Sequence, residues 1–238
     1  MALNKEIFKT RSLTALIFVA VMLAGLLWNR WSFVILFTII HFGCWYEFIK
    51  LMKKIHGEKF LPFCLFGLLY ITLPISMMLN LGFKGDVYTN DKINEITNTV
   101  FYSPIIPCGI VFSIWINDTM AYIVGSLFGK TPFSKISPKK TWEGTGGGAI
   151  LCVVVIGLLG YFIPVVKAVP LRHRIAIAAL CAIFGTIGDL FESKLKRMAN
   201  VKDSGTIMPG HGGFLDRFDS LLFAAPAVWV YVKFFVMG

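Results

Sequence analysis

Apolar segments long enough to cross a bilayer recur along the whole chain of 238 residues. A spanning helix needs about 20 mainly apolar residues. Because lipid offers no hydrogen bonds, the backbone of a span must satisfy its own polar groups, and a helix does so. We therefore predict an all-α, polytopic transmembrane helix bundle with about seven spans. The predicted spans are residues 13–28, 31–49, 60–83, 100–128, 149–166, 175–190 and 214–237.

The composition agrees with this class. Hydrophobic residues make up 56% of the chain and charged residues 15%, whereas roughly a quarter of a soluble domain is charged. A disordered chain, a nucleic-acid-binding arm and an ordinary cytosolic enzyme are thereby excluded. The net charge of +10 would suggest nucleic acid in a soluble protein, but cytoplasmic loops of membrane proteins are rich in Lys and Arg. We expect membrane lipids as partners and no nucleic acid.

The distribution of Lys and Arg predicts an orientation. With the N-terminus inside, most of the 23 Lys and Arg residues fall in cytoplasmic segments, as the positive-inside rule requires. Two long polar, Gly-rich loops, 129–148 and 191–213, then lie on the cytoplasmic face and are expected to form the active site. We predict one integral membrane domain, 1–238, with N-terminal spans in 1–110 and a catalytic core in 111–225. Short loops without a targeting extension favour a multi-pass protein of a bacterial inner (plasma) membrane.

Acidic residues recur at helical spacing near two of the span ends. Asp189 and Glu192 are three residues apart and share a helix face, which Lys196 extends. Asp216 and Asp219 repeat the spacing at the head of the last span. Oxygen ligands without cysteine suit a hard cation such as Mg²⁺. The alternatives are salt bridges between helices and acids on a solvated helix end.

Basic residues and glycines fill the two polar loops. Lys139 and Lys140 precede the glycine run 146–148, and several bases precede the Pro209–Gly213 segment. Lys and Arg bind phosphate oxygens, and glycines let backbone N–H groups approach an anion. This pattern indicates a nucleoside triphosphate or pyrophosphate, although no P-loop motif occurs. Close helix packing remains an alternative for 146–148, and a purely structural hydrogen bond remains one for His211.

The second loop resembles the signature of the CTP:phosphatidate cytidylyltransferases, the CDP-diacylglycerol synthases. The matching positions are Ser193, Lys196, Arg197, Lys202, Asp203, Gly205, Pro209, His211, Gly212, Gly213, Asp216, Arg217 and Asp219. Met208 departs conservatively from the usual Leu, Ile or Phe. The segments 117–118, 137–144 and 188–193 also resemble the family, so the likeness covers roughly residues 110–225.

The resemblance implies a reaction and its cofactors. Phosphatidate and CTP would give CDP-diacylglycerol and pyrophosphate, with dependence on Mg²⁺. The family resemblance also implies a paired-cation centre at Asp189 and Asp216, in which the second ion is a monovalent cation such as K⁺. A homodimer is a further implication of the family.

The site residues are predicted in three groups. The predicted metal ligands are Asp189, Asp216 and Asp219. The predicted catalytic residues are those three with Lys196, Arg197, Lys202, Asp203, His211 and Arg217. The predicted substrate-binding residues are Asp118, Ser137, Lys139, Lys140, Glu143, Glu192 and Ser193.

Other functions are compatible with part of the pattern. A polyprenol kinase or another cytidylyltransferase would share the membrane setting and the need to bind polyanions. A transporter or channel would use acids within its spans, but it usually shows repeat symmetry, and this sequence shows no internal repeat. A structural scaffold would explain neither the acid pairs nor the loops.

Overall fold

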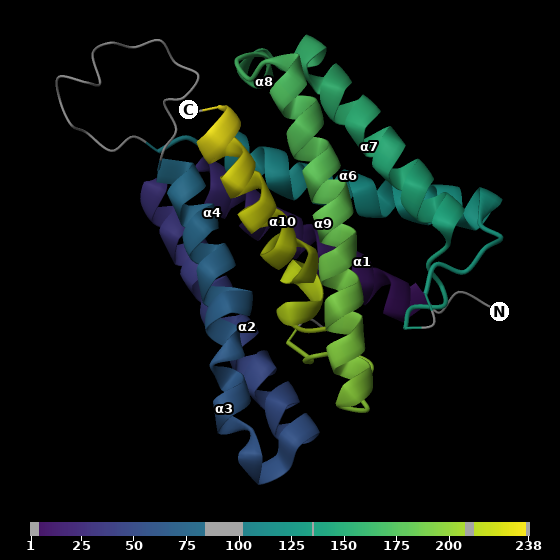
Figure 1. Cartoon of the computed structure of the whole chain (residues 1–238). Coiled ribbons are helices and arrows are strands. Elements are labelled where there is room, and N and C mark those ends of the chain that lie inside the picture. The colour runs from purple at the N-terminus through teal and green to yellow at the C-terminus, as the bar shows by residue number, and fades with distance from the viewer. Residues whose placement is uncertain (1–4, 84–101, 135, 208–211, 237–238) are drawn as a thin grey trace.

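The computed structural model describes residues 5–83, 102–134, 136–207 and 212–236, with side chains from residue 12 onward. The chain is a bundle of helices (Figure 1). Of the residues described, none forms a named strand, and Pro132 and Thr141 make an isolated antiparallel bridge. The helices are α1 (Lys5–Leu27), α2 (Arg30–His56), α3 (Leu61–Cys64), α4 (Leu73–Phe83), α6 (Ile105–Phe128), α7 (Trp142–Phe162), α8 (Pro164–Lys167), α9 (Leu171–Met198) and α10 (Leu215–Phe235).

The described chain contains 6 helical segments that are long and apolar enough to cross a membrane. The all-α, polytopic prediction is therefore confirmed. The first predicted span, 13–28, corresponds to the apolar part of α1, Ser12–Leu27, which is shorter than the others; a seventh span stays a prediction. The spanning segments are Arg30–Lys59, Leu61–Phe83, Ile105–Phe128, Trp142–Phe162, Leu171–Met198 and Leu215–Phe235.

Two helix boundaries differ from the predicted ones: α7 begins before residue 149, and α9 continues to Met198, so residues 191–198 of the predicted loop 191–213 are helical. The predicted start of a span at 149 is wrong, because α7 begins at Trp142. Thr141 caps this helix, and its Oγ1 accepts a hydrogen bond from the Gly144 N–H at 3.1 Å. Within the predicted span 100–128, α6 runs through Asp118 without interruption.

The span 61–83 is not one regular helix. A π-helical turn, Leu68–Thr72, separates α3 from α4. Pro74 follows this turn, and a proline lacks an N–H and collides with the carbonyl of the preceding helical turn. Wider turns of this kind occur where the regular helical ladder is interrupted.

The helices α9 and α10 pack side by side in the middle of the bundle. The pair α6 and α7 lies on one side of them, and α2 and α4 lie on the other (Figure 1). Phe33, Ile40 and Phe48 of α2 and Met78 of α4 are almost fully buried in the shared core. Because lipid tails are as apolar as these side chains, close packing rather than transfer from water holds such helices together.

Small residues bring α6 and α7 into direct backbone contact. A Cβ atom added at Gly148 would lie 2.7 Å from the Ala121 Cα, and one added at Gly144 would lie 2.8 Å from the Gly125 Cα. Small residues four apart on facing helices are the usual means of close packing in membranes. The packing alternative for the glycine run therefore holds at Gly148, whereas a Cβ at Gly146 would meet no atom within 4 Å.

This difference predicts opposite effects for two glycines on the same helix. Gly148→Ala is expected to destabilise the protein by about 1–3 kcal/mol, because the added methyl overlaps α6. Gly146→Ala is the matched control and is expected to be neutral or stabilising by up to about 1 kcal/mol, since alanine is the better helix former. Thermal unfolding in detergent measures both variants, and equal melting temperatures would contradict the packing.

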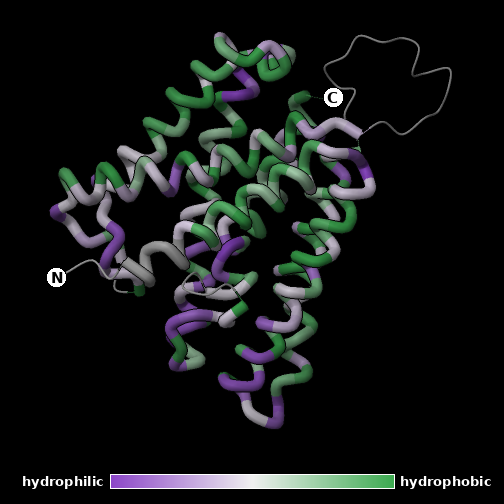
Figure 2. Tube along the Cα trace, turned by 180° about the vertical axis from the view of Figure 1, so that it is seen from behind, coloured by the Kyte–Doolittle hydropathy of each residue, from purple (hydrophilic) through white to green (hydrophobic). Residues whose placement is uncertain are grey.

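Polar residues are unevenly distributed along the bundle. Figure 2 shows most of the hydrophilic positions at the end of the bundle where α2 and α9 finish and around the start of α1. The start of α10 lies near this end, and the C-terminal end of α10 lies toward the other (Figure 1). The end of α9 and the start of α10, which flank the second predicted loop, thus lie toward the end where hydrophilic positions gather (Figure 1 and Figure 2).

Candidate active site

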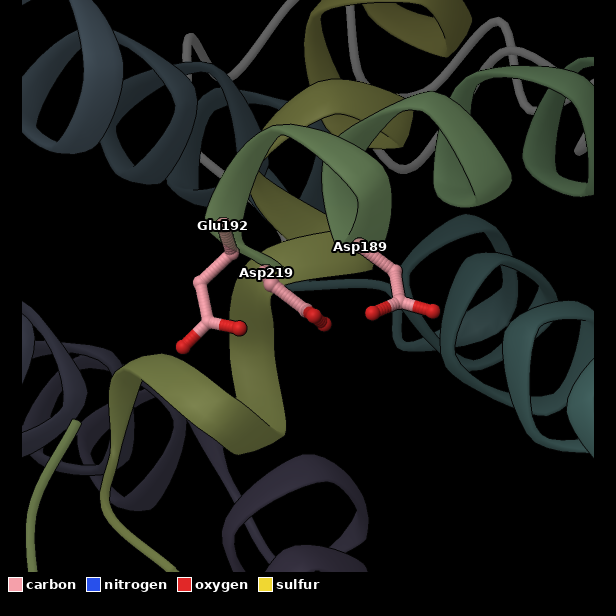
Figure 3. Close-up of side chains that lie close together, drawn as sticks. All are labelled: Asp189, Glu192 and Asp219. Carbon is pink, nitrogen blue, oxygen red and sulfur yellow. The ribbon is translucent and has the colours of Figure 1, made fainter. Parts of the chain in front are cut away.

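Three carboxylates from two neighbouring helices gather where α9 and α10 pack. Asp189 and Glu192 come from α9 and Asp219 from α10, and one oxygen of each lies within 4.8 Å of the others (Figure 3). Asp219 lies between the other two in this view. Glu192 is 0% exposed and Asp219 is 8% exposed. Carboxylates held this closely repel one another unless a cation or protons neutralise them.

The local sequence explains why these groups meet. The spacing of three residues places Asp189 and Glu192 on one face of α9. Gly188 lets that helix approach α10, because a Cβ at this position would lie 2.4 Å from the Asp219 carbonyl oxygen. A residue with a side chain would push the helices apart and move Asp219 away from the other two carboxylates.

Two lysines neutralise part of this charge. The Lys196 ammonium forms ion pairs with Glu192 and with Asp216, the latter at 2.6 Å. Its side chain is 15% exposed, so the pair is largely shielded from water. Lys140, from the loop between α6 and α7, forms an ion pair with Asp189. Ion pairs therefore connect the loop between α6 and α7 to α9, and α9 to α10.

Asp216 lies beside the cluster and not in it. Its Oδ1 faces Lys196, and its Oδ2 accepts hydrogen bonds from the Ser204 N–H, the Ser204 hydroxyl and the Gly213 N–H, each at 2.8 Å. Both oxygens are thus occupied by protein donors. Of the predicted metal ligands the structure brings Asp189 and Asp219 together, with Glu192 as the third carboxylate. A metal-binding role for Asp216 stays a prediction.

A polar cavity of about 460 Å³ adjoins the cluster. Five residues predicted to bind metal or substrate line it: Asp118 of α6, Ser137, Lys139 and Lys140 of the following loop, and Asp189 of α9. Lys140 and Asp189 are also an ion pair. The cavity therefore combines basic side chains with direct access to one carboxylate of the cluster.

One residue that lines the same cavity had no predicted role in the site. Asn117 lines it beside Asp118 and is 4% exposed. Its Oδ1 is buried and has no hydrogen-bond partner in the described part of the chain. An unpaired buried amide oxygen costs free energy unless a ligand or water supplies a donor.

Glu143 does not line this cavity. Its carboxylate accepts hydrogen bonds from the Thr131 hydroxyl at 2.8 Å, the Thr131 N–H at 3.1 Å and the Lys130 N–H at 3.2 Å. These bonds tie the loop after α6 to the first turn of α7. The contacts seen for Glu143 fix the loop that carries Lys139 and Lys140.

Lys202 and Asp203 line a different cavity, of about 790 Å³. Its opposite wall is the end of α2, which contributes Lys50, Lys53 and Lys54. Neither Lys202 nor Asp203 lines the cavity beside Asp189. Their predicted catalytic roles stay predictions.

The remaining predicted residues are distributed around these features. The Ser193 hydroxyl donates to the Asp189 Oδ1 at 3.4 Å. Arg197, near the end of α9, and Arg217, directly after Asp216, are both exposed. His211 lies outside the described residues. The roles predicted for these four residues stay predictions.

Sequence reasoning missed Glu47. This acid of α2 is 1% exposed and accepts a hydrogen bond from the Ser204 hydroxyl at 2.7 Å. Its partners lie 157 or more positions away in the chain, so no local pattern could reveal them. One signal was present, because a lone acid within an apolar span is by itself a sign of function.

Comparison with known proteins identifies the family to which this chain is similar. The model of the cytidylyltransferase family matches residues 60–235. The phosphatidate cytidylyltransferase of Rickettsia felis is 33% identical over 235 residues, covering 96% of this chain and 94% of the relative. That of Thermotoga maritima is 35% identical over 225 residues, covering 79% and 83%.

Other relatives match over a shorter stretch. The chloroplastic phosphatidate cytidylyltransferase 4 of Arabidopsis thaliana is 43% identical over 116 residues, which are 49% of this chain and 29% of the relative. The chain thus spans less than a third of that protein's length. The family match nevertheless includes every helix from α3 to α10, and the two bacterial relatives align over most of their lengths. The chain belongs to the cytidylyltransferase family.

Proposed function

We propose that the chain transfers the cytidylyl group of CTP to phosphatidate, forming CDP-diacylglycerol and pyrophosphate for phospholipid biosynthesis. The observation that carries this proposal is the ion pair between Lys140 and Asp189, which joins the cavity that contains Lys139 and Lys140 to the carboxylate cluster. An anion-binding cavity and a cation site then share a wall, as the attack of one polyanion on another requires. The names of the two bacterial relatives support the choice of substrates.

The carboxylate cluster fits a hard divalent cation. Asp189, Glu192 and Asp219 offer oxygen ligands within 4.8 Å of one another, and Mg²⁺ prefers such ligands. Bound there, Mg²⁺ would neutralise phosphate oxygens and the charge on the leaving pyrophosphate. A second, monovalent cation such as K⁺ remains part of the proposal.

In this reaction the protein contributes mainly by positioning the substrates and stabilising their charge, and less by transferring protons. An oxygen of the phosphatidate phosphate attacks the α-phosphorus of CTP, and the bond from that phosphorus to the bridging oxygen breaks. Because the attacking phosphate is already ionised, no general base is needed. Lys139 and Lys140 hold the CTP phosphates in the cavity, and Asp118 and Ser137 contact the nucleotide beside them. Alignment of the two reactants supplies much of the remaining acceleration.

The other bases of the signature complete the anion site. Lys196, Arg197, Lys202 and Arg217 contact the phosphates of the two substrates. Lys196 has the firmest position of the four, since two carboxylates hold it. Arg217 follows Asp216 in the first turn of α10 and is exposed.

The proposal includes a location. The chain is a multi-pass membrane protein, and we place it in a bacterial inner membrane with the site on the cytoplasmic face, where CTP is made. The collection of hydrophilic positions at one end of the bundle supports this orientation (Figure 2), as does the positive-inside rule. Membrane lipids surround the bundle, and a homodimer is the proposed assembly.

Asp216→Asn is expected to lower turnover roughly 10–100-fold. An amide presents an NH₂ group either to Lys196 or to the N–H groups of Ser204 and Gly213, so a donor faces a donor. Turnover in mixed micelles measures the loss, and a cooperative thermal unfolding transition shows that the variant is folded. Full activity in the folded variant would remove Asp216 from the site.

The proposed function is tested by identifying the product. Purified protein in mixed micelles receives phosphatidate, CTP and Mg²⁺, and the lipid fraction is analysed by mass spectrometry. We expect CDP-diacylglycerol that depends on both substrates, disappears with EDTA and does not form when ATP replaces CTP. A phosphorylated lipid would support a kinase. The absence of any CTP-dependent product from folded protein, with every lipid acceptor tried, would favour a transporter.

A further inference from the structure

Glu47 is a buried acid in the second half of the apolar helix α2. Its carboxylate is engaged by three donors from a distant part of the chain. Its Oε2 accepts from the Ser204 hydroxyl at 2.7 Å and from the Leu215 N–H at 2.9 Å, and its Oε1 accepts from the Phe214 N–H at 2.9 Å. With 1% of the residue exposed, these bonds replace water as the partners of the charge.

Two of these donors belong to the start of α10. The first N–H groups of a helix have no partner within it, and Phe214, at the N-cap position, makes no side-chain capping bond. Glu47 supplies the missing acceptor from another helix, and its negative charge lies at the positive end of the α10 dipole. It thereby fixes the first turn of the helix that carries Asp216 and Asp219.

The third donor extends the contact toward the carboxylate cluster. The Ser204 hydroxyl lies 2.7 Å from Glu47 and 2.8 Å from the Asp216 Oδ2, so one hydroxyl proton is shared between two carboxylates. Asp216 in turn contacts Lys196, and Lys196 contacts Glu192 of the cluster. A continuous series of polar contacts therefore runs from α2 to the proposed cation site.

The loop before α10 is shaped around this carboxylate. A Cβ atom at Gly205 would lie 2.1 Å from the Glu47 Oε1, and one at Gly213 would lie 2.2 Å from it. A side chain at either position would displace Glu47. Both glycines belong to the segment that resembles the signature, whereas the family match begins at residue 60, after Glu47.

We propose that Glu47 is a positioning residue for the cation site. It holds Ser204 and the start of α10, and through them it sets the Asp216–Lys196 pair that fixes Glu192. Without it, Lys196 can withdraw to Glu192 alone and compete with the cation for that carboxylate. The effect on catalysis rests on the proposed function, but the effect on cation binding does not.

The test measures Mn²⁺ affinity, with the metal alone, on the full chain in detergent. The variants are Glu47→Gln and Ser204→Ala, and Glu58→Gln is the control because Glu58 is an exposed acid just beyond α2. Ser204→Ala leaves the two backbone bonds to Glu47 in place, so it isolates the route through the hydroxyl. Loss of a group that orients metal ligands weakens affinity roughly 10–100-fold. We expect about a tenfold weaker affinity in both variants and no change in the control.

Several outcomes would overturn the proposal. If Glu47→Gln lowers the melting temperature while both variants bind Mn²⁺ like the wild type, Glu47 is only a helix cap. If the wild type binds no Mn²⁺, there is no cation site to position. Should Glu47→Gln fail to fold, Glu47→Asp replaces it, because the shorter side chain keeps the charge but draws it away from Ser204 and Leu215; wild-type Mn²⁺ affinity in that variant would also overturn the proposal. If the affinity shift is found but the wild type makes no CDP-diacylglycerol, the proposed function fails and the positioning role stands.

Discussion

Asp219→Asn is expected to reduce turnover roughly a thousandfold, which corresponds to about 4 kcal/mol of transition-state stabilisation. Asp219 lies between Asp189 and Glu192 (Figure 3). A cation bound by all three carboxylates, as proposed, would therefore depend on the charge of Asp219. Its Oδ1 accepts the Ser220 N–H at 2.6 Å, and an asparagine oxygen can keep that bond. The substitution therefore removes charge while leaving the backbone contact intact.

Measurements of cation binding and of stability distinguish the loss of a metal ligand from a general loss of folded protein. Asp219→Asn should also raise the half-saturating Mg²⁺ concentration, while the melting temperature in EDTA stays at or above that of the wild type. Glu58→Gln removes the same charge from an exposed turn and should change neither quantity. Normal turnover with a normal Mg²⁺ requirement in folded Asp219→Asn would place the reaction elsewhere.

Lys196→Met is expected to lower the free energy of unfolding by about 3 kcal/mol. The substitution removes the ammonium group that pairs with both Glu192 and Asp216, and both carboxylates are largely buried. Removal of one partner from a buried ion pair is costly because the other charge stays unpaired. Since a chain of this size loses about 2–4 °C per kcal/mol, the melting temperature should fall by about 10 °C.

Added Mg²⁺ distinguishes the cause of this loss. A cation bound at Glu192 replaces part of the missing charge, and a ligand that binds only the folded state stabilises it. Mg²⁺ should therefore raise the melting temperature of Lys196→Met more than that of the wild type. Lys194→Met is the matched control, since Lys194 is exposed on the same helix, and it should melt normally. Equal melting of the two lysine variants would contradict the buried pairing.

The sequence predicted the class of fold and the shared helix face of Asp189 and Glu192. Runs of apolar residues define the spans because a bilayer imposes one length scale and one secondary structure. The spacing of three between Asp189 and Glu192 likewise fixes a shared helix face. These inferences depend only on local geometry, and the structure agrees with them.

Contacts between distant segments were beyond the same reasoning. Asp216 and Asp219 have the same local pattern as Asp189 and Glu192, yet only Asp219 joins the cluster, because the loop at Ser204 and Gly213 occupies Asp216. The pairing of Glu47 with that loop depends on how α2 packs against α10. The early start of α7 depends on the capping bond of Thr141. Each of these features depends on hydrogen-bond partners that the spacing of residues in the sequence does not reveal.

The position of a radioactive label tests the central claim most directly. Protein in mixed micelles with phosphatidate and Mg²⁺ receives CTP labelled either at the α-phosphorus or at the γ-phosphorus. A cytidylyltransferase places the α label in the lipid fraction and the γ label in pyrophosphate, in equal amounts. Label from the γ position in the lipid would show a kinase reaction, and no label in the lipid from either position would contradict the account.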